Sequence, residues 1–189
     1  GAWRDDLCGC CNHGCCHPHL CMSACGFTPI LLAQVMYRMR LNWYGSGPTN
    51  SEFQRNVTFY LVTFLFWSLV ILPAAWAIWG ANRLSMCQDD CSPLMEESAS
   101  WIPGVACMVI ALYFFILTCR TRRAIRHQFR IRETTCCCCR GCEDFCCTYW
   151  CTGLTVMQMA RHTADYETYA ASCCSKTGVA ARHPPVVVV

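Results

Sequence analysis

Two long stretches without charged residues constrain the fold of this chain more than any other feature of its sequence. The first stretch is the 27 residues between Arg55 and Arg83, and its centre, residues 57–79, is almost wholly apolar. The second stretch is centred on residues 101–119. As a helix, the first centre would measure about 34 Å, whereas the hydrocarbon core of a bilayer is about 30 Å thick. The sequence therefore predicts a hairpin of two transmembrane helices.

The composition favours a membrane protein over the alternative, a soluble domain with two buried helices. Only 14% of the 189 residues are charged and 54% are hydrophobic, whereas soluble domains average about 25% charged residues. A chain of this length is also too short to cover two such helices on every side. We therefore expect an all-α membrane protein, built as a two-span transmembrane helical hairpin flanked by Cys-rich, irregular-to-helical modules.

Changes in composition along the chain divide it into eight segments. In order, we expect an N-terminal Cys/His-rich module with a short amphipathic helix (1–41), a linker (42–56), a transmembrane helix (57–80), an acidic loop (81–100), a second transmembrane helix (101–119), a basic juxtamembrane helix (120–135), a Cys-rich module with a helix (136–174) and a tail (175–189). The short helix, expected at residues 27–41, cannot span a bilayer. We expect it to lie at the membrane surface as an amphipathic or re-entrant helix, the alternative being a core helix packed against the hairpin.

The distribution of basic residues predicts the orientation of the hairpin. Four arginines precede the first span and ten basic residues follow the second, whereas the connecting loop contains one arginine and four acidic residues. By the positive-inside rule, both termini are expected on the cytosolic or equivalent side and the loop on the opposite side. We expect the protein in the plasma membrane, with an organellar membrane as the alternative.

Two local features depend on this orientation. Cys87 and Cys91 lie in the acidic loop, on the side expected to be oxidising, and we expect a disulfide between them. Residues 56–58 match the N-glycosylation sequon, but they abut the membrane on the inner side. We therefore expect Asn56 to carry no glycan.

Most of the 21 cysteines fall into two terminal blocks on the expected reducing side, where disulfides are not the default. Thiolates and imidazoles at these short spacings suit a tetrahedral zinc site. The candidate metal ligands are Cys8, Cys10, Cys11, Cys15, Cys16, His17, Cys21, Cys25, Cys138, Cys139, Cys142, Cys146, Cys147 and Cys151. Acylation of juxtamembrane cysteines is a second interpretation, and disulfides or buried thiols are a third.

Two charged motifs follow the second span. The first is a run of arginines, expected to fix the topology and to contact anionic lipid, where each basic residue near the surface contributes about 1 kcal/mol. Its candidate lipid-contacting residues are Arg120, Arg122, Arg123 and Arg126. The second motif is the acid pair Glu143-Asp144. It is interpreted either as a cation ligand or, preferably, as a solvated turn or a partner for Arg140.

The sequence offers no recognisable catalytic constellation. It contains no glycine-rich phosphate loop, no G-x-S-x-G motif and no ordered set of Ser, His and Asp, and no single cysteine stands out as a nucleophile. The net charge of +3 is too small to indicate nucleic-acid binding. We therefore expect neither an enzyme nor a nucleic-acid-binding protein.

The order of the cysteines and their neighbours carries a family resemblance. The first half contains Trp3, Leu7, Cys8, Cys16, Cys21, Cys25, Phe27, Pro29 and Ala33-Gln34. The second half contains Arg126, Phe129, Arg130, Ile131, Cys142, Asp144, Cys146-Cys147, Cys151, Gln158 and Arg161. This pattern resembles the cysteine-rich placenta-specific-eight family, which includes cornifelin, the plant cadmium-resistance proteins and the fruit-weight or cell-number regulators. Departures from it are the sequence CGFTP in place of Cys-Pro-Cys and the additional cysteines at 136–139.

The resemblance implies a small, self-associating membrane protein connected with divalent-cation handling or growth control. Our first hypothesis is therefore a homo-oligomer whose cytosolic Cys-rich modules bind cadmium, zinc or calcium for tolerance or transport, with zinc as the expected cofactor. The alternative hypothesis is an accessory or structural subunit that packs its hairpin against a larger membrane complex. Both hypotheses include contacts with membrane lipids.

Overall fold

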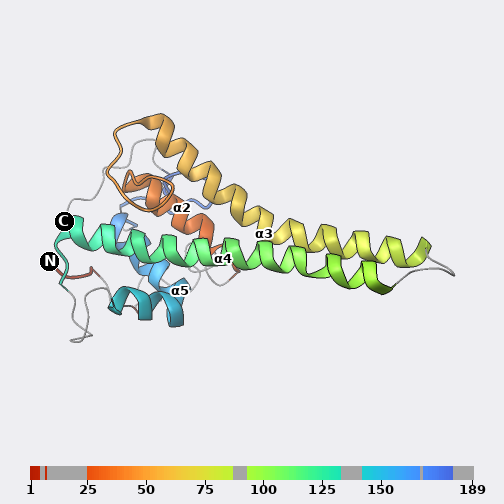
Figure 1. The fold of residues 1–189 in the computed structure, drawn as a ribbon. Coiled ribbons are helices and arrows are strands. Elements are labelled where there is room, and N and C mark those ends of the chain that lie inside the picture. The colour runs from red at the N-terminus through yellow and green to blue at the C-terminus, as the bar shows by residue number, and fades with distance from the viewer. Residues whose placement is uncertain (5–6, 8–24, 87–92, 133–141, 167, 181–189) are drawn as a thin grey trace.

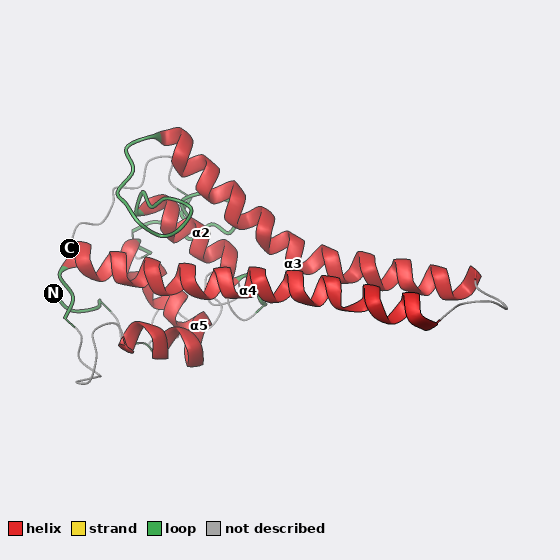
Figure 2. Cartoon of the chain, viewed as in Figure 1, coloured by secondary structure: helices red, strands yellow, loops and turns green. Residues whose placement is uncertain are grey.

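The computed structural model describes residues 1–4, 7, 25–86, 93–132, 142–166 and 168–180. Four helices form this part of the chain: α2 (Thr28–Arg38), α3 (Glu52–Met86), α4 (Pro93–Phe129) and α5 (Cys142–Thr163). Within the same residues there is no strand, and the only β-type contact is an isolated bridge between Ala171 and Val179 (Figure 2). The all-helical prediction is confirmed.

The helices form a long arm that projects from a compact base. α3 and α4 run antiparallel and side by side along the arm, and they diverge at the base (Figure 1). α2 and α5 pack against them only at this end. The amino group of Gly1 donates a hydrogen bond to the carbonyl of Arg130 at 2.8 Å, which places the N-terminus beside the end of α4.

The arm exposes most of its apolar surface. Residues 52–82 of α3 and 101–129 of α4 are long and apolar enough to cross a membrane, yet only 11% and 17% of their most apolar windows are buried. The exposed large side chains include Phe64, Trp67, Val70, Ile71, Leu72, Ile78, Trp79, Trp101, Ile102, Val105, Met108, Val109, Leu112 and Ile116. The two helices are therefore not the buried core helices of a soluble domain, since the rest of the described chain does not cover them.

α2 is a core helix of the base. It begins next to Pro29, whose fixed φ suits a first turn, and all six residues 31–36 are buried. The rings of Phe27 and Phe66 lie 5.8 Å apart, and those of Tyr37 and Phe59 lie 6.3 Å apart, so α2 runs antiparallel along α3. The expectation of an amphipathic helix at the membrane surface is wrong, because α3, α4 and α5 pack around α2. The alternative, a core helix packed against the hairpin, is correct.

α4 continues without a break from its apolar segment into the basic segment, as expected, but it is shorter than the predicted range to residue 135. The helix ends at Phe129, and Arg130 adopts a left-handed backbone conformation with φ of 53°. An α-helix cannot continue through such a residue.

α5 consists of two parts that meet at Cys151, where φ is −138° and ψ is 45°. The hydroxyl of Thr155 donates to the carbonyl of Cys147 at 2.9 Å across this kink, satisfying a carbonyl near the interruption. Residues 155–163 are all buried in the base. The first part instead exposes Phe145, Tyr149 and Trp150.

Candidate functional site

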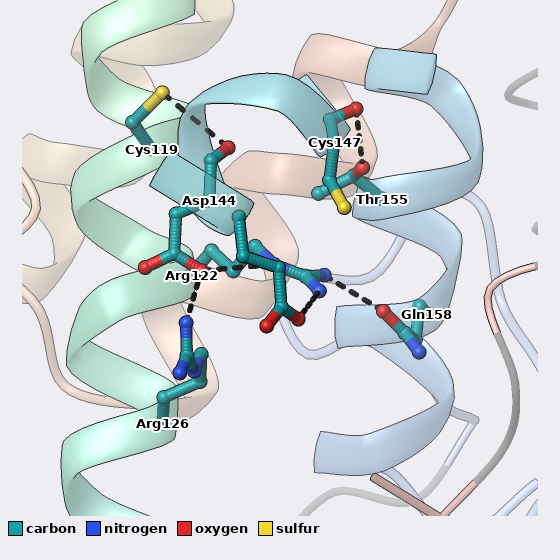
Figure 3. Close-up of polar contacts among 8 residues, drawn as sticks. Cys119, Arg122, Arg126, Asp144, Cys147, Thr155 and Gln158 are labelled. Carbon is teal, nitrogen blue, oxygen red and sulfur yellow. Dashed lines mark hydrogen bonds and ion pairs between the residues drawn. The ribbon is translucent and has the colours of Figure 1, made fainter. Parts of the chain in front are cut away.

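The arginines that follow the apolar segment of α4 point to two different faces of the helix. Because α-helical side chains three or four positions apart share a face, Arg122 and Arg126 lie on one side and Arg120 and Arg123 on another. Arg122 and Arg126 are 2% and 5% exposed, respectively, whereas Arg120 and Arg123 are exposed. The buried pair faces α5 and forms the largest polar cluster of the base (Figure 3).

Arg122 lies at the centre of this cluster and contacts three side chains of α5. Its Nε donates to Oδ1 of Asp144 at 3.1 Å, and its Nη1 donates to Oε1 of Gln158 at 2.7 Å. Its Nη2 lies 3.4 Å from Oε1 of Glu143. These contacts come from both parts of α5, so one guanidinium fixes the two parts of the kinked helix to α4.

Arg126 extends the cluster by one turn of α4. Its Nη1 donates to the same Oδ1 of Asp144 at 2.9 Å. Two guanidinium groups thus face two carboxylates, and Glu143 and Asp144 are both buried. A buried charge is tolerated when a partner of opposite sign and hydrogen bonds compensate it, and this cluster balances two positive with two negative charges.

Two expectations for these residues need correction. Arg122 and Arg126 were expected to contact lipid, but both are buried against α5; for the exposed Arg120 and Arg123, lipid contact stays a prediction. The acid pair was expected in a solvated turn or beside Arg140, but it is buried in a helix and pairs with Arg122 and Arg126. These ion pairs also occupy the carboxylates that were considered as cation ligands.

The N-terminal residues cover the outer side of the cluster. The guanidinium of Arg122 lies 4.6 Å from the ring centroid of Trp3, within the range of a cation–π contact. The backbone N–H of Arg4 donates to Nδ1 of His162 at 3.1 Å, and the rings of Trp3 and His162 meet edge to face. Several residues that carry the family resemblance, Trp3 and Asp144 among them, therefore have a structural role here.

A second set of polar contacts connects α2 to the C-terminal segment, and the sequence analysis missed it. Nε2 of Gln34 donates to the carbonyls of Ser172, Cys173 and Ser175 at 3.3, 3.0 and 2.9 Å. Arg38 donates to the carbonyl of Thr177 at 2.6 Å. The available signal was a single amide in an otherwise apolar helix, since a buried polar side chain needs partners.

The described part of the C-terminal cysteine block brings two thiols together. The Sγ atoms of Cys142 and Cys146 lie 3.8 Å apart, one helical turn from each other. Cys146 is exposed, whereas Cys147 and Cys151 are half-buried. Burial raises the pKa of the Cys147 thiol; Arg122 opposes this shift, and the nearby carboxylates add to it.

The other predicted ligands do not form a metal site within the described residues. No group of three or more His, Cys, Asp or Glu side chains that could hold a metal ion occurs there, and the described ligand Cys25 is exposed. Several candidates lie outside the described residues: Cys8, Cys10, Cys11, Cys15, Cys16, His17, Cys21, Cys138 and Cys139. The proposed disulfide partners Cys87 and Cys91 lie outside them as well.

Comparisons of the chain with protein-family models, with curated proteins and with solved structures found no significant match. The functional argument therefore rests on the sequence and on the geometry described above.

Proposed function

We propose that this protein is a small integral membrane protein that inserts its α3–α4 arm into a bilayer and presents its cysteine-rich base to divalent metal ions on the cytosolic face. The resemblance to the cysteine-rich placenta-specific-eight family supports metal handling and self-association. The plasma membrane is the proposed location. The arm provides the anchor, and the thiols next to the base bind the metal.

The exposed apolar surface of the arm is the observation that carries this proposal. Large hydrophobic side chains occur along both helices, while the ion pairs lie only in the base. In water, contiguous apolar patches larger than a few hundred square ångströms are rare on monomeric proteins. A lipid environment removes this cost, because the hydrocarbon core solvates such side chains.

The separation of two thiols supports a soft metal as the ligand. Two sulfurs that bind one tetrahedral zinc ion at about 2.3 Å lie about 3.8 Å apart. The sulfurs of Cys142 and Cys146 lie at 3.8 Å. They would supply two of the four ligands, and the cysteines at 136–139 are near enough in sequence to supply the others.

Elemental analysis of protein purified in mild detergent under reducing conditions tests the metal assignment. We expect stoichiometric zinc, or cadmium after exchange, in the full chain and its loss in the double variant Cys142→Ser/Cys146→Ser. The matched control is Cys173→Ser/Cys174→Ser, which removes two exposed thiols elsewhere. Equal metal contents in the two double variants, or none in the parent protein, would rule out this site.

The same arm suits the alternative role of an accessory subunit within a larger membrane complex. Its aromatic side chains would then pack against other transmembrane helices rather than lipid. Co-purification with a larger complex in fixed stoichiometry would favour this role, whereas a stable homo-oligomer would favour the self-associating metal-binding protein. Cross-linking in the native membrane followed by mass spectrometry separates the two.

A further inference from the structure

A cavity of about 740 Å³ opens between α4 and the loop that connects α2 to α3. It lies on the face of α4 opposite to the buried ion pairs, so it is separate from the site described above. The described residues that line it combine positive side chains from α4 with a short glycine-containing loop. They are Leu41, Gly45, Ser46, Gly47, Pro48, Arg120, Arg123, Ala124, His127 and Gln128.

The α4 wall of this cavity is basic. Arg120, Arg123 and His127 follow the spacing i, i+3 and i+7, which places them on one face of a helix. All three are exposed, and none of the lining residues is acidic. Arginine binds phosphate groups well, because its planar guanidinium can donate two parallel hydrogen bonds to one anion.

The opposite wall is a loop that is fixed against α4. Gly45 has φ of +81°, and a Cβ atom there would lie 3.0 Å from Cβ of Arg120 and 3.3 Å from N of Thr121. Only glycine allows both this backbone conformation and this close approach. Oδ1 of Asn42 accepts hydrogen bonds from the backbone N–H groups of Tyr44 and Ser46. The cavity is thus a preformed site rather than a patch of mobile surface charges.

Aromatic side chains place the cavity at the level of lipid headgroups. Arg120 is the first charged residue after the apolar segment of α4. Its guanidinium lies 4.8 Å from the ring centroid of Tyr44, and Tyr44 and its neighbour Trp43 are 42% and 52% exposed. The Tyr113 hydroxyl donates to the carbonyl of Trp43, which ties the loop to the apolar segment. Exposed Trp and Tyr are typical of the membrane–water interface.

We propose that this cavity binds the phosphate group of an anionic phospholipid headgroup in the inner leaflet, with Arg120 and Arg123 as the main ligands. The assignment rests on the proposed insertion of the arm, which brings the cavity to the depth of the headgroups. A soluble phosphate ester has the same binding chemistry. The two sources differ in that only the lipid has acyl chains that can lie along the arm.

Lipid titration of the purified full chain in neutral detergent tests this proposal, with phosphatidic acid as the probe and phosphatidylcholine as the zwitterionic control. We expect preferential binding of phosphatidic acid and a loss of about 30-fold in affinity in Arg120→Gln/Arg123→Gln, from the known contribution of two basic residues near an anionic surface. The matched control Arg130→Gln/Arg132→Gln removes two exposed charges outside the cavity and should bind within about twofold of the parent protein.

Two further arms make the test decisive. Arg120→Lys/Arg123→Lys keeps the charge and should retain more affinity than the glutamine variant, which excludes loss of folding as the cause. Glycerol 3-phosphate, the headgroup without acyl chains, should bind much more weakly than phosphatidic acid. Equal losses in the two glutamine variants would reduce the site to diffuse surface charge, and equal binding of glycerol 3-phosphate would exclude a lipid ligand.

Membrane extraction keeps this inference distinct from the proposed function. Protein that resists extraction by alkaline carbonate but shows no preference for phosphatidic acid would disprove the lipid site alone. Protein that carbonate releases from membranes would disprove insertion of the arm.

Discussion

Arg122 and Arg123 are neighbours in the chain but have opposite environments. The guanidinium of Arg122 is buried among side chains of α5 and the ring of Trp3, whereas Arg123 is exposed and lines the cavity. Their positions follow from the helical period, which turns adjacent residues by about 100°. This pair therefore offers a matched comparison between a buried and an exposed charge.

We expect Arg122→Met to lower the free energy of unfolding by about 3–5 kcal/mol, because it leaves the buried carboxylates of Glu143 and Asp144 without their shared partner. Arg123→Met makes the same chemical change at an exposed position and should alter it by about 0.5 kcal/mol or less. Denaturant unfolding in one detergent measures both values. Equal stabilities of the two variants would contradict the structural role of the cluster.

Cys147 should show a distinctive pH dependence. Burial raises the pKa of its thiol, and only the thiolate reacts with alkylating reagents. We expect alkylation of Cys147 to be slow near neutral pH and to increase over a higher pH range than in a short cysteine peptide. Pulsed alkylation with peptide mapping measures this profile, with the exposed Cys146 as a reference site. Faster reaction of Cys147 than of the peptide at neutral pH would contradict the prediction.

The sequence could predict the residue types of the site better than their partners. The i, i+4 spacing of Arg122 and Arg126 already places them on one face, and the acid pair was recognised as a candidate motif. Which face is buried depends on where α5 docks, and that contact joins residues more than 15 positions apart. Short-range patterns do not contain this information, so both motifs were assigned to solvent or lipid.

Among the elements, the transmembrane segments were the most predictable. Their apolar cores are longer than most helices of soluble domains and determine the helix type by composition alone. The role of α2 was harder to predict, because the apolar composition of residues 30–36 fits a membrane surface as well as a protein core. The contact of α2 with the C-terminal segment decides between these, and the sequence gives only the isolated Gln34 as a signal.

Gln34 should hold the C-terminal segment against α2. Its replacement in Gln34→Met leaves three carbonyls without their donor, and we expect a loss of about 1–3 kcal/mol in local stability. Because a protease needs locally unfolded chain, trypsin should then cleave faster after Lys176. The control Gln128→Met changes an exposed glutamine on α4. Mass spectrometry of the fragments gives the rates, and equal cleavage in both variants would contradict this role.

The molecule as a whole separates two kinds of surface along its length. The arm exposes aromatic and aliphatic side chains, and the base contains the ion pairs, the basic cavity and the described thiols of the C-terminal block. This division matches the boundary between the hydrocarbon core and the interface of a bilayer. The described structure and the distribution of basic residues agree on which end of the hairpin would face the cytosol.

The most direct test of this account is a glycosylation map of the hairpin in microsomal or cellular membranes. A flexible acceptor segment is inserted after Gln88 in one variant and after Val189 in another. We predict a glycan on the insert after Gln88 and none on the C-terminal insert or on Asn56, since the loop crosses the membrane while both termini stay inside. A glycan on the C-terminal insert, or none on the loop insert, would contradict a two-span hairpin with this orientation.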